Sequence, residues 1–176
     1  MSTQHRYDYM RSSIKDGDIL LYKGSGWFSA LIKFFTKSKY SHAGIACWWN
    51  NRLMVLEAVG KGVIVTPLSK NIKEYPGTVE LFFPNKISEA QRKKIISFAQ
   101  IELGKEYSIW KLFLYMFTKK DKRDAYRKEN KLFCSHFVAS TYNYAGYDIV
   151  KGTSDSYTTP EDIATSDKIS FKGNLK

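Results

Sequence analysis

Three side chains of this chain could together carry out hydrolysis by a cysteine nucleophile: those of Cys134, His42 and Glu57. Such chemistry needs a thiolate, a nearby imidazole to exchange its proton, and a group that fixes the tautomer of that imidazole. The chain has three histidines. His5 lies in a polar N-terminal stretch, and His136 follows Cys134 by two residues, where a helix would turn it about 200° away. His42 is therefore the predicted base.

The two cysteines, Cys47 and Cys134, differ in their predicted surroundings. Cys134 begins a stretch with a helical pattern, and the N-terminus of a helix has free backbone N–H groups and a partial positive charge. Both features stabilise a thiolate, and the same N–H groups could form an oxyanion hole. Cys47 lies in the middle of a predicted strand beside two tryptophans, where no such field is expected. Cys134 is therefore the predicted nucleophile.

Glu57 interrupts an apolar run between Val55 and Val59 on a predicted strand. A buried carboxylate is costly unless it is paired. Residues 41–49 and 52–59 are predicted to be two strands joined by an Asn-Asn turn, and this hairpin brings Glu57 alongside the strand of His42. We expect a His42–Glu57 hydrogen bond that orients the imidazole.

Each of these residue types also has a purely structural explanation. A cysteine in an apolar helix is commonly a small core residue. A histidine on a strand is commonly structural, and a glutamate on a strand commonly faces solvent. Residue types and spacing leave both explanations open, so the surrounding elements and motifs have to distinguish them.

The elements expected to position these side chains change in type along the chain. Apolar runs bounded by turn residues predict strands over 18–22, 41–49, 52–59, 62–68 and 78–83. Apolar spacing and capping residues predict helices over 27–36, 88–103 and 133–144 and from Thr159. This order indicates one α+β domain over residues 1–176, with an antiparallel sheet or partial barrel packed against helices. Within it, 1–15 is expected to be a flexible tail and 118–131 an exposed basic connection.

Length and composition limit the possible classes of protein. The chain has 176 residues, 43% of them hydrophobic, which suits one domain whose core needs neither disulfides nor a metal, and no cofactor is predicted. It shows no apolar signal segment near its start and no run of eighteen apolar residues, so we expect a cytoplasmic protein. A net charge of +11 favours anionic partners without choosing among them. No arginine-rich or RNP-like pattern indicates specific nucleic-acid binding.

The motifs around the three residues resemble those of a known superfamily. In chain order they are Gly17-Asp18-Ile19-Leu20, Tyr40-Ser41-His42-Ala43-Gly44-Ile45, Leu56-Glu57-Ala58-Val59 and Phe133-Cys134-Ser135-His136-Phe137-Val138-Ala139. This set looks like the circularly permuted NlpC-type papain-like cysteine hydrolases, the YiiX/YaeF-like group, which are distantly related to lecithin:retinol acyltransferase-like enzymes. In the unpermuted relatives the cysteine helix precedes the histidine strand, whereas here the histidine comes first. The resemblance implies a permuted papain-like fold and a Cys134–His42–Glu57 triad that forms an acyl-thioester.

Two further segments extend the resemblance. Residues 103–107 resemble the Leu-Gly-x-x-Tyr element that precedes the cysteine in the unpermuted enzymes, which implies that Tyr107 contacts the substrate or the oxyanion. Residues 158–164 resemble the Thr-Pro-x-Asp segment that follows the cysteine helix in the group. Ser41 and Ser135 are also expected to contact the substrate.

The resemblance implies amide or ester bonds in peptides or lipids as substrates. Phe133 and His136 stand where the unpermuted enzymes have Asp and Gly. The peptidoglycan specificity of those enzymes therefore does not carry over directly to this chain. One expected function is an amidase or peptidase that cuts a peptide-type bond, such as one in a cell-wall stem peptide. A second is a lipid deacylase or acyltransferase that uses the same thiol, and a third is a non-catalytic binding module on this scaffold. The sequence does not indicate an oligomeric state.

An apolar, aromatic stretch over Ile109–Phe117 is followed by several lysines and an arginine. The stretch is too short to span a bilayer, and its composition suits an interfacial helix or an acyl-chain groove. A core helix with snorkelling lysines explains it as well. A basic residue near an anionic surface contributes on the order of 1 kcal/mol. We therefore expect weak, salt-sensitive contact of residues 109–123 with anionic membranes.

Overall fold

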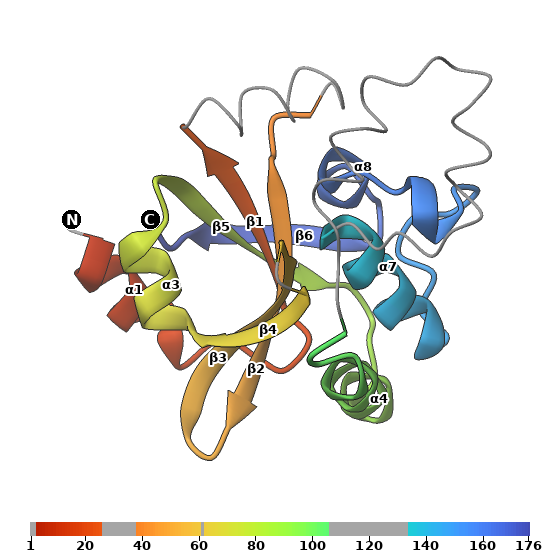
Figure 1. The fold of residues 1–176 in the computed structure, drawn as a ribbon, viewed down its shortest axis with the longest axis horizontal. Helices are drawn as coiled ribbons and strands as arrows, with labels where there is room; N and C mark the ends of the chain where they lie inside the picture. Colours follow the sequence, from red (N-terminus) through yellow and green to blue (C-terminus); the bar gives the residue numbers. More distant parts are fainter. Residues whose placement is uncertain (1–2, 26–37, 61, 106–133) are drawn as a thin grey trace.

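A computed structural model describes residues 3–25, 38–60, 62–105 and 134–176 of the chain (Figure 1). Its helices are α1 (Thr3–Arg11), α3 (Leu68–Glu74), α4 (Glu89–Ile101), α7 (Cys134–Tyr144) and α8 (Pro160–Ala164), with a 3-10 turn, η1 (Asp155–Tyr157). Its strands are β1 (Ile19–Gly24), β2 (His42–Trp49), β3 (Arg52–Val59), β4 (Gly62–Pro67), β5 (Gly77–Pro84) and β6 (Ile169–Asn174). None of the described helices is long and apolar enough to cross a membrane.

The six strands form one antiparallel sheet with the order β4-β3-β2-β1-β5-β6. The sheet is open, with β4 and β6 at its edges, so the predicted α+β fold with an antiparallel sheet is confirmed. Among the described residues the sheet does not close into a barrel. The register places His42 opposite Tyr22 and Leu56 opposite Ile45. The hairpin of β2 and β3 therefore brings the strands of His42 and Glu57 side by side.

Helices cover both faces of this sheet, with α1 and α3 on one side and α4, α7 and α8 on the other (Figure 1). Side chains alternate between the faces of a strand. Ile19 and Leu21 of β1 join the core beneath α4, α7 and α8. Leu20 and Tyr22 join the core beneath α1 and α3. Because both faces are covered, β1 is apolar along almost its whole length.

Local sequence signals account for several element boundaries. Asn50 and Asn51 have φ values of 46° and 65°, the left-handed conformation that a tight hairpin turn needs. Ser88 accepts a hydrogen bond from the Gln91 N–H in a reciprocal capping box, and this confirms the predicted start of α4. Thr159 makes a matching capping box with the residue three positions on, which confirms the predicted start of α8.

The structure corrects the prediction of a flexible tail over residues 1–15. Residues Thr3–Arg11 form α1, and Tyr7 and Ile14 are only 6% and 2% exposed. The segment is polar overall, but these two side chains pack into the core beneath α1 and α3. Helix α3 and strand β6 were also not predicted. The predictions for 27–36 and 118–131 fall outside the described residues.

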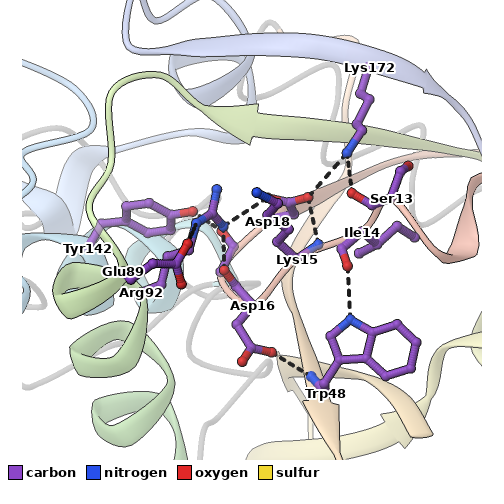
Figure 2. A network of polar contacts seen from close by, with 11 residues as sticks. Ser13, Ile14, Lys15, Asp16, Asp18, Trp48, Glu89, Arg92, Tyr142 and Lys172 are labelled. Atoms are coloured by element: carbon purple, nitrogen blue, oxygen red, sulfur yellow. Dashed lines mark hydrogen bonds and ion pairs between the residues drawn. The ribbon is translucent and has the colours of Figure 1, made fainter. Parts of the chain in front are cut away.

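A buried polar network ties together the start of β1, α4 and β6 (Figure 2). The Asp18 carboxylate lies 3.0 Å from Arg92 Nη1, accepts the Lys15 N–H at 3.0 Å, and lies 3.8 Å from Lys172 Nζ. The Tyr142 hydroxyl of α7 donates to a backbone carbonyl of the same turn. A buried carboxylate is stable only when it is paired and hydrogen-bonded. This network therefore fixes α4 and α7 against the sheet that carries His42.

Candidate active site

Cys134 is the first residue of α7 and is half-buried. Phe137, Val138 and Tyr142 of the same helix are fully buried against the sheet, which sets the position of the helix. At its N-terminus the Ser135 hydroxyl donates a 2.6 Å hydrogen bond to the Thr158 carbonyl oxygen. The start of α7, and with it the thiol, is held from two directions.

His42 is the first residue of β2, and its ring packs on that of Tyr22, with a centroid distance of 5.0 Å and an interplanar angle of 54°. Just before the strand, the Lys39 N–H donates a 2.6 Å hydrogen bond to Glu161 Oε2 at the start of α8. The nearby Thr158 carbonyl accepts the hydrogen bond from the Ser135 hydroxyl. Residues 158–161 therefore connect the start of the cysteine helix, α7, to the segment just before the histidine strand, β2.

The structure brings Cys134, His42 and Glu57 together. His42 Nε2 lies 2.7 Å from Glu57 Oε2, and the ring also makes a side-chain hydrogen bond with Cys134. Since Nε2 faces Glu57, the nitrogen left for the thiol is Nδ1. Gly44 permits the close approach of β3, because a Cβ there would lie 2.8 Å from a methyl carbon of Val55. The imidazole is thus held between a thiol and a carboxylate.

The pKa values of His42 and Cys134 shift in opposite directions because each charge stabilises the other. Burial lowers the pKa of His42, but the Cys134 thiolate and then the Glu57 carboxylate outweigh burial and raise it to about 10. Burial raises the pKa of Cys134, but the charge and hydrogen bond of His42 and the backbone N–H groups of Ala43 and Ser135 bring it below its ordinary value. The arrangement favours a thiolate–imidazolium pair.

Cys47 lies in an environment that disfavours a thiolate, unlike that of Cys134. It is fully buried in the core between the sheet and α7. Burial, with a smaller contribution from the negative charge of Asp16, raises the pKa of Cys47 to about 12. The two thiols of the chain therefore differ sharply in their expected reactivity at neutral pH.

The chain matches, over residues 13–157, a family described as permuted papain-like amidase enzymes, YaeF/YiiX, the C92 family. The chain belongs to this family. Its fold is also similar to the crystal structure described as metalloprotein YiiX from Escherichia coli O157:H7, with a TM-score of 0.68 and 21% sequence identity over 90% of this chain and 96% of that chain. No curated protein matches the chain. The resemblance to the YiiX/YaeF-like group is thereby confirmed, as is the permuted papain-like fold.

The other residues expected at this site of the amidase family have different placements. Ser41 and Ser135 are buried, and their hydroxyls are occupied within the protein. The Ser41 hydroxyl accepts the Gly24 N–H at 3.1 Å, and that of Ser135 binds the carbonyl described above. Both side chains therefore fix the backbone beside the site, and their contact with a substrate stays a prediction. Tyr107 falls outside the described residues.

Two residues that contact the predicted triad were not predicted from the sequence, Asn71 and Ala43. Asn71 of α3 donates a 2.8 Å hydrogen bond from Nδ2 to Glu57 Oε1. The backbone N–H of Ala43 contacts the thiol. The apolar pair Leu68 and Ile72, spaced by one helical turn, could have indicated α3. No sequence signal singles out Asn71, because its role arises only where α3 meets β3.

Proposed function

We propose that this member of the amidase family is a cysteine amidase or peptidase. Cys134 is the nucleophile, His42 its base and acid, and Glu57 the residue that orients His42. The observation that carries the proposal is the environment of the His42 ring, which is hydrogen-bonded to the Cys134 thiol and, through Nε2, to the Glu57 carboxylate at 2.7 Å.

The reaction then has two steps. The Cys134 thiolate attacks the carbonyl carbon of the amide, and backbone N–H groups at the start of α7 stabilise the oxyanion. His42 gives its Nδ1 proton to the leaving amine, and an acyl-thioester forms. In the second step Nδ1 accepts a proton from water as the water attacks the thioester. The carboxylic acid departs, and the proton and the thiolate are restored to His42 and Cys134.

The family description favours the amidase over the lipid and binding alternatives. A lipid deacylase or acyltransferase would use the same thiol and differ in the acyl group or acceptor that the site takes. The described residues include no group of three or more His, Cys, Asp and Glu side chains that could hold a metal ion. The YiiX structure is described as that of a metalloprotein. The steps proposed for this chain use Cys134, His42 and Glu57. Contact of residues 109–123 with anionic membranes stays a prediction from composition.

Intact-mass measurement of the protein, quenched at short times after mixing with activated acyl compounds, tests this function. One arm uses an activated peptide amide and the other a fatty-acyl ester. We expect a peptide-acyl adduct on Cys134 that forms and then clears by hydrolysis. An adduct from the fatty-acyl arm alone would move the assignment to the lipid reaction. No adduct in either arm, from protein whose Cys134 still reacts with iodoacetamide, would overturn the proposal in favour of a binding module.

A further inference from the structure

We propose that Asn71 is a positioning residue for this site, which holds the Glu57 carboxylate and through it the tautomer of His42. The inference deepens the proposed function, because it rests on the roles given there to His42 and Glu57.

Each oxygen of Glu57 has its own partner. Oε2 faces His42 Nε2 at 2.7 Å, and Oε1 accepts the Asn71 Nδ2–H at 2.8 Å. The Glu57 residue is only 5% exposed, so little water is available to replace either bond. A carboxylate held at one oxygen alone could turn about its last torsion, whereas two separate contacts fix its plane. Asn71 supplies the second contact.

Asn71 is itself oriented by Tyr22. The Tyr22 hydroxyl lies 2.9 Å from Asn71 Oδ1 and donates to it. Tyr22 is fully buried, and its ring lies 4.8 Å from the ring of Tyr75 and 5.0 Å from that of His42. Burial and the charge of Glu57 raise the pKa of Tyr22 well above its ordinary value, so the hydroxyl remains a donor. Tyr22 thus supports both Asn71 and the imidazole.

These contacts determine which group is the donor and which is the acceptor in each hydrogen bond from Tyr22 to His42. An ionised carboxylate only accepts, so the Asn71 amide must present its NH₂ group to Glu57 and its oxygen to Tyr22. For the same reason His42 must donate from Nε2. In the neutral tautomer that remains, Nδ1 carries no proton and faces Cys134. A base that accepts a proton from the thiol or from water needs this tautomer.

The backbone that carries Asn71 is fixed. Leu68 and Ile72 of the same helix are buried in the core beneath the sheet. The Asn71 carbonyl accepts the Tyr75 N–H at 2.9 Å, and the Tyr75 hydroxyl lies 3.1 Å from the Ser41 hydroxyl, next to His42. A donor on a packed element holds its partner more accurately than one on a mobile loop.

The test compares Asn71→Ala with Asn85→Ala. Asn85 is a matched control, since it is also half-buried and its side chain makes two hydrogen bonds, to the Asp167 carbonyl and the Ser170 hydroxyl, close to β6. The readout is the pH profile of Cys134 alkylation by iodoacetamide, which needs no substrate. In Asn71→Ala we expect a rate at neutral pH about tenfold lower and a midpoint about one pH unit higher, because the imidazolium loses part of its support. Asn85→Ala should match the wild type.

A second pair covers the case in which Asn71→Ala fails to fold. Tyr22→Phe removes only the hydroxyl that orients Asn71. Tyr147→Phe, the control, removes the hydroxyl of another buried tyrosine, which donates to the Asn85 and Lys168 carbonyls. Tyr22→Phe should shift the alkylation midpoint in the same direction by a smaller amount, and Tyr147→Phe should not shift it.

The outcomes separate this inference from the proposed function. An alkylation profile unchanged in folded Asn71→Ala, or in Tyr22→Phe where Asn71→Ala does not fold, would overturn the role of Asn71 whatever the protein hydrolyses. A shifted profile in a protein that forms no acyl adduct would support the role of Asn71 and count against the hydrolase alone. In an active protein the same variant should lower kcat with little change in KM.

Discussion

Cys134→Ala is expected to remain folded and to lose turnover, whereas Cys47→Ala is expected to lose stability and keep turnover. The first change removes the sulfur that attacks the carbonyl in the proposed mechanism, and loss of a covalent nucleophile lowers turnover by on the order of 10⁶-fold. The second removes a fully buried sulfur from the core between the sheet and α7. Deleting one such buried atom costs about 1 kcal/mol of unfolding free energy.

The two cysteine variants control for one another. Initial rates and thermal unfolding are measured on the same preparations of both. Turnover that persists in Cys134→Ala above the level of the buffer would remove the thiol from the mechanism. Loss of turnover in a folded Cys47→Ala protein would mean that the wrong cysteine had been assigned.

Glu57→Gln is expected to lower turnover by about 10³- to 10⁴-fold, with a much smaller effect on stability. Asn71 presents an NH₂ group to Oε1 of residue 57, so the new amide places its own oxygen there and its NH₂ toward His42. Nε2 must then accept, and the ring proton moves to Nδ1, where it blocks proton transfer from the thiol. The shape of the site is kept while the tautomer is wrong.

The measurement is kcat beside the free energy of unfolding of Glu57→Gln. Glu80→Gln is a suitable control, because Glu80 is a buried carboxylate on β5 that pairs with Lys23 and Tyr40. Turnover near the wild-type value in Glu57→Gln would show that the carboxylate does not orient the base. Unfolding of Glu57→Gln, with Glu80→Gln still folded, would make Glu57 a structural residue.

Local signals in the sequence were sufficient to predict many of the strands and helices that position the site. The bounds of β3 agree with the predicted 52–59, because an Asn-Asn turn and a glycine delimit an apolar run. The helix that begins at Cys134 and the capping boxes of Ser88 and Thr159 also follow from neighbouring residues alone. Short-range rules apply well where the interactions that fix an element lie within a few residues of each other.

The elements that were missed depend on contacts distant in sequence. Strand β6, Ile169–Asn174, contains polar residues and a glycine and is a strand because it pairs with β5. Helix α3 has only seven residues, too few to be stable alone, and it is fixed by burial of two side chains. Asn71 meets Tyr22 from 49 positions away. Such pairings arise from tertiary packing, which periodicity in one segment does not encode.

The proposed function requires His42 to hold Cys134 as a thiolate, and the pH dependence of alkylation measures the state of this thiol. Iodoacetamide labelling of the native protein, resolved for each cysteine by mass spectrometry, is followed from acid to alkaline pH. We expect Cys134 to react at neutral pH with a midpoint below 9.0, the ordinary value for a cysteine, while Cys47 stays unlabelled. In His42→Gln the Cys134 midpoint should rise. Equal labelling of the two thiols, or a Cys134 midpoint at or above 9.0 that His42→Gln does not move, would show that His42 does not hold Cys134 as a thiolate.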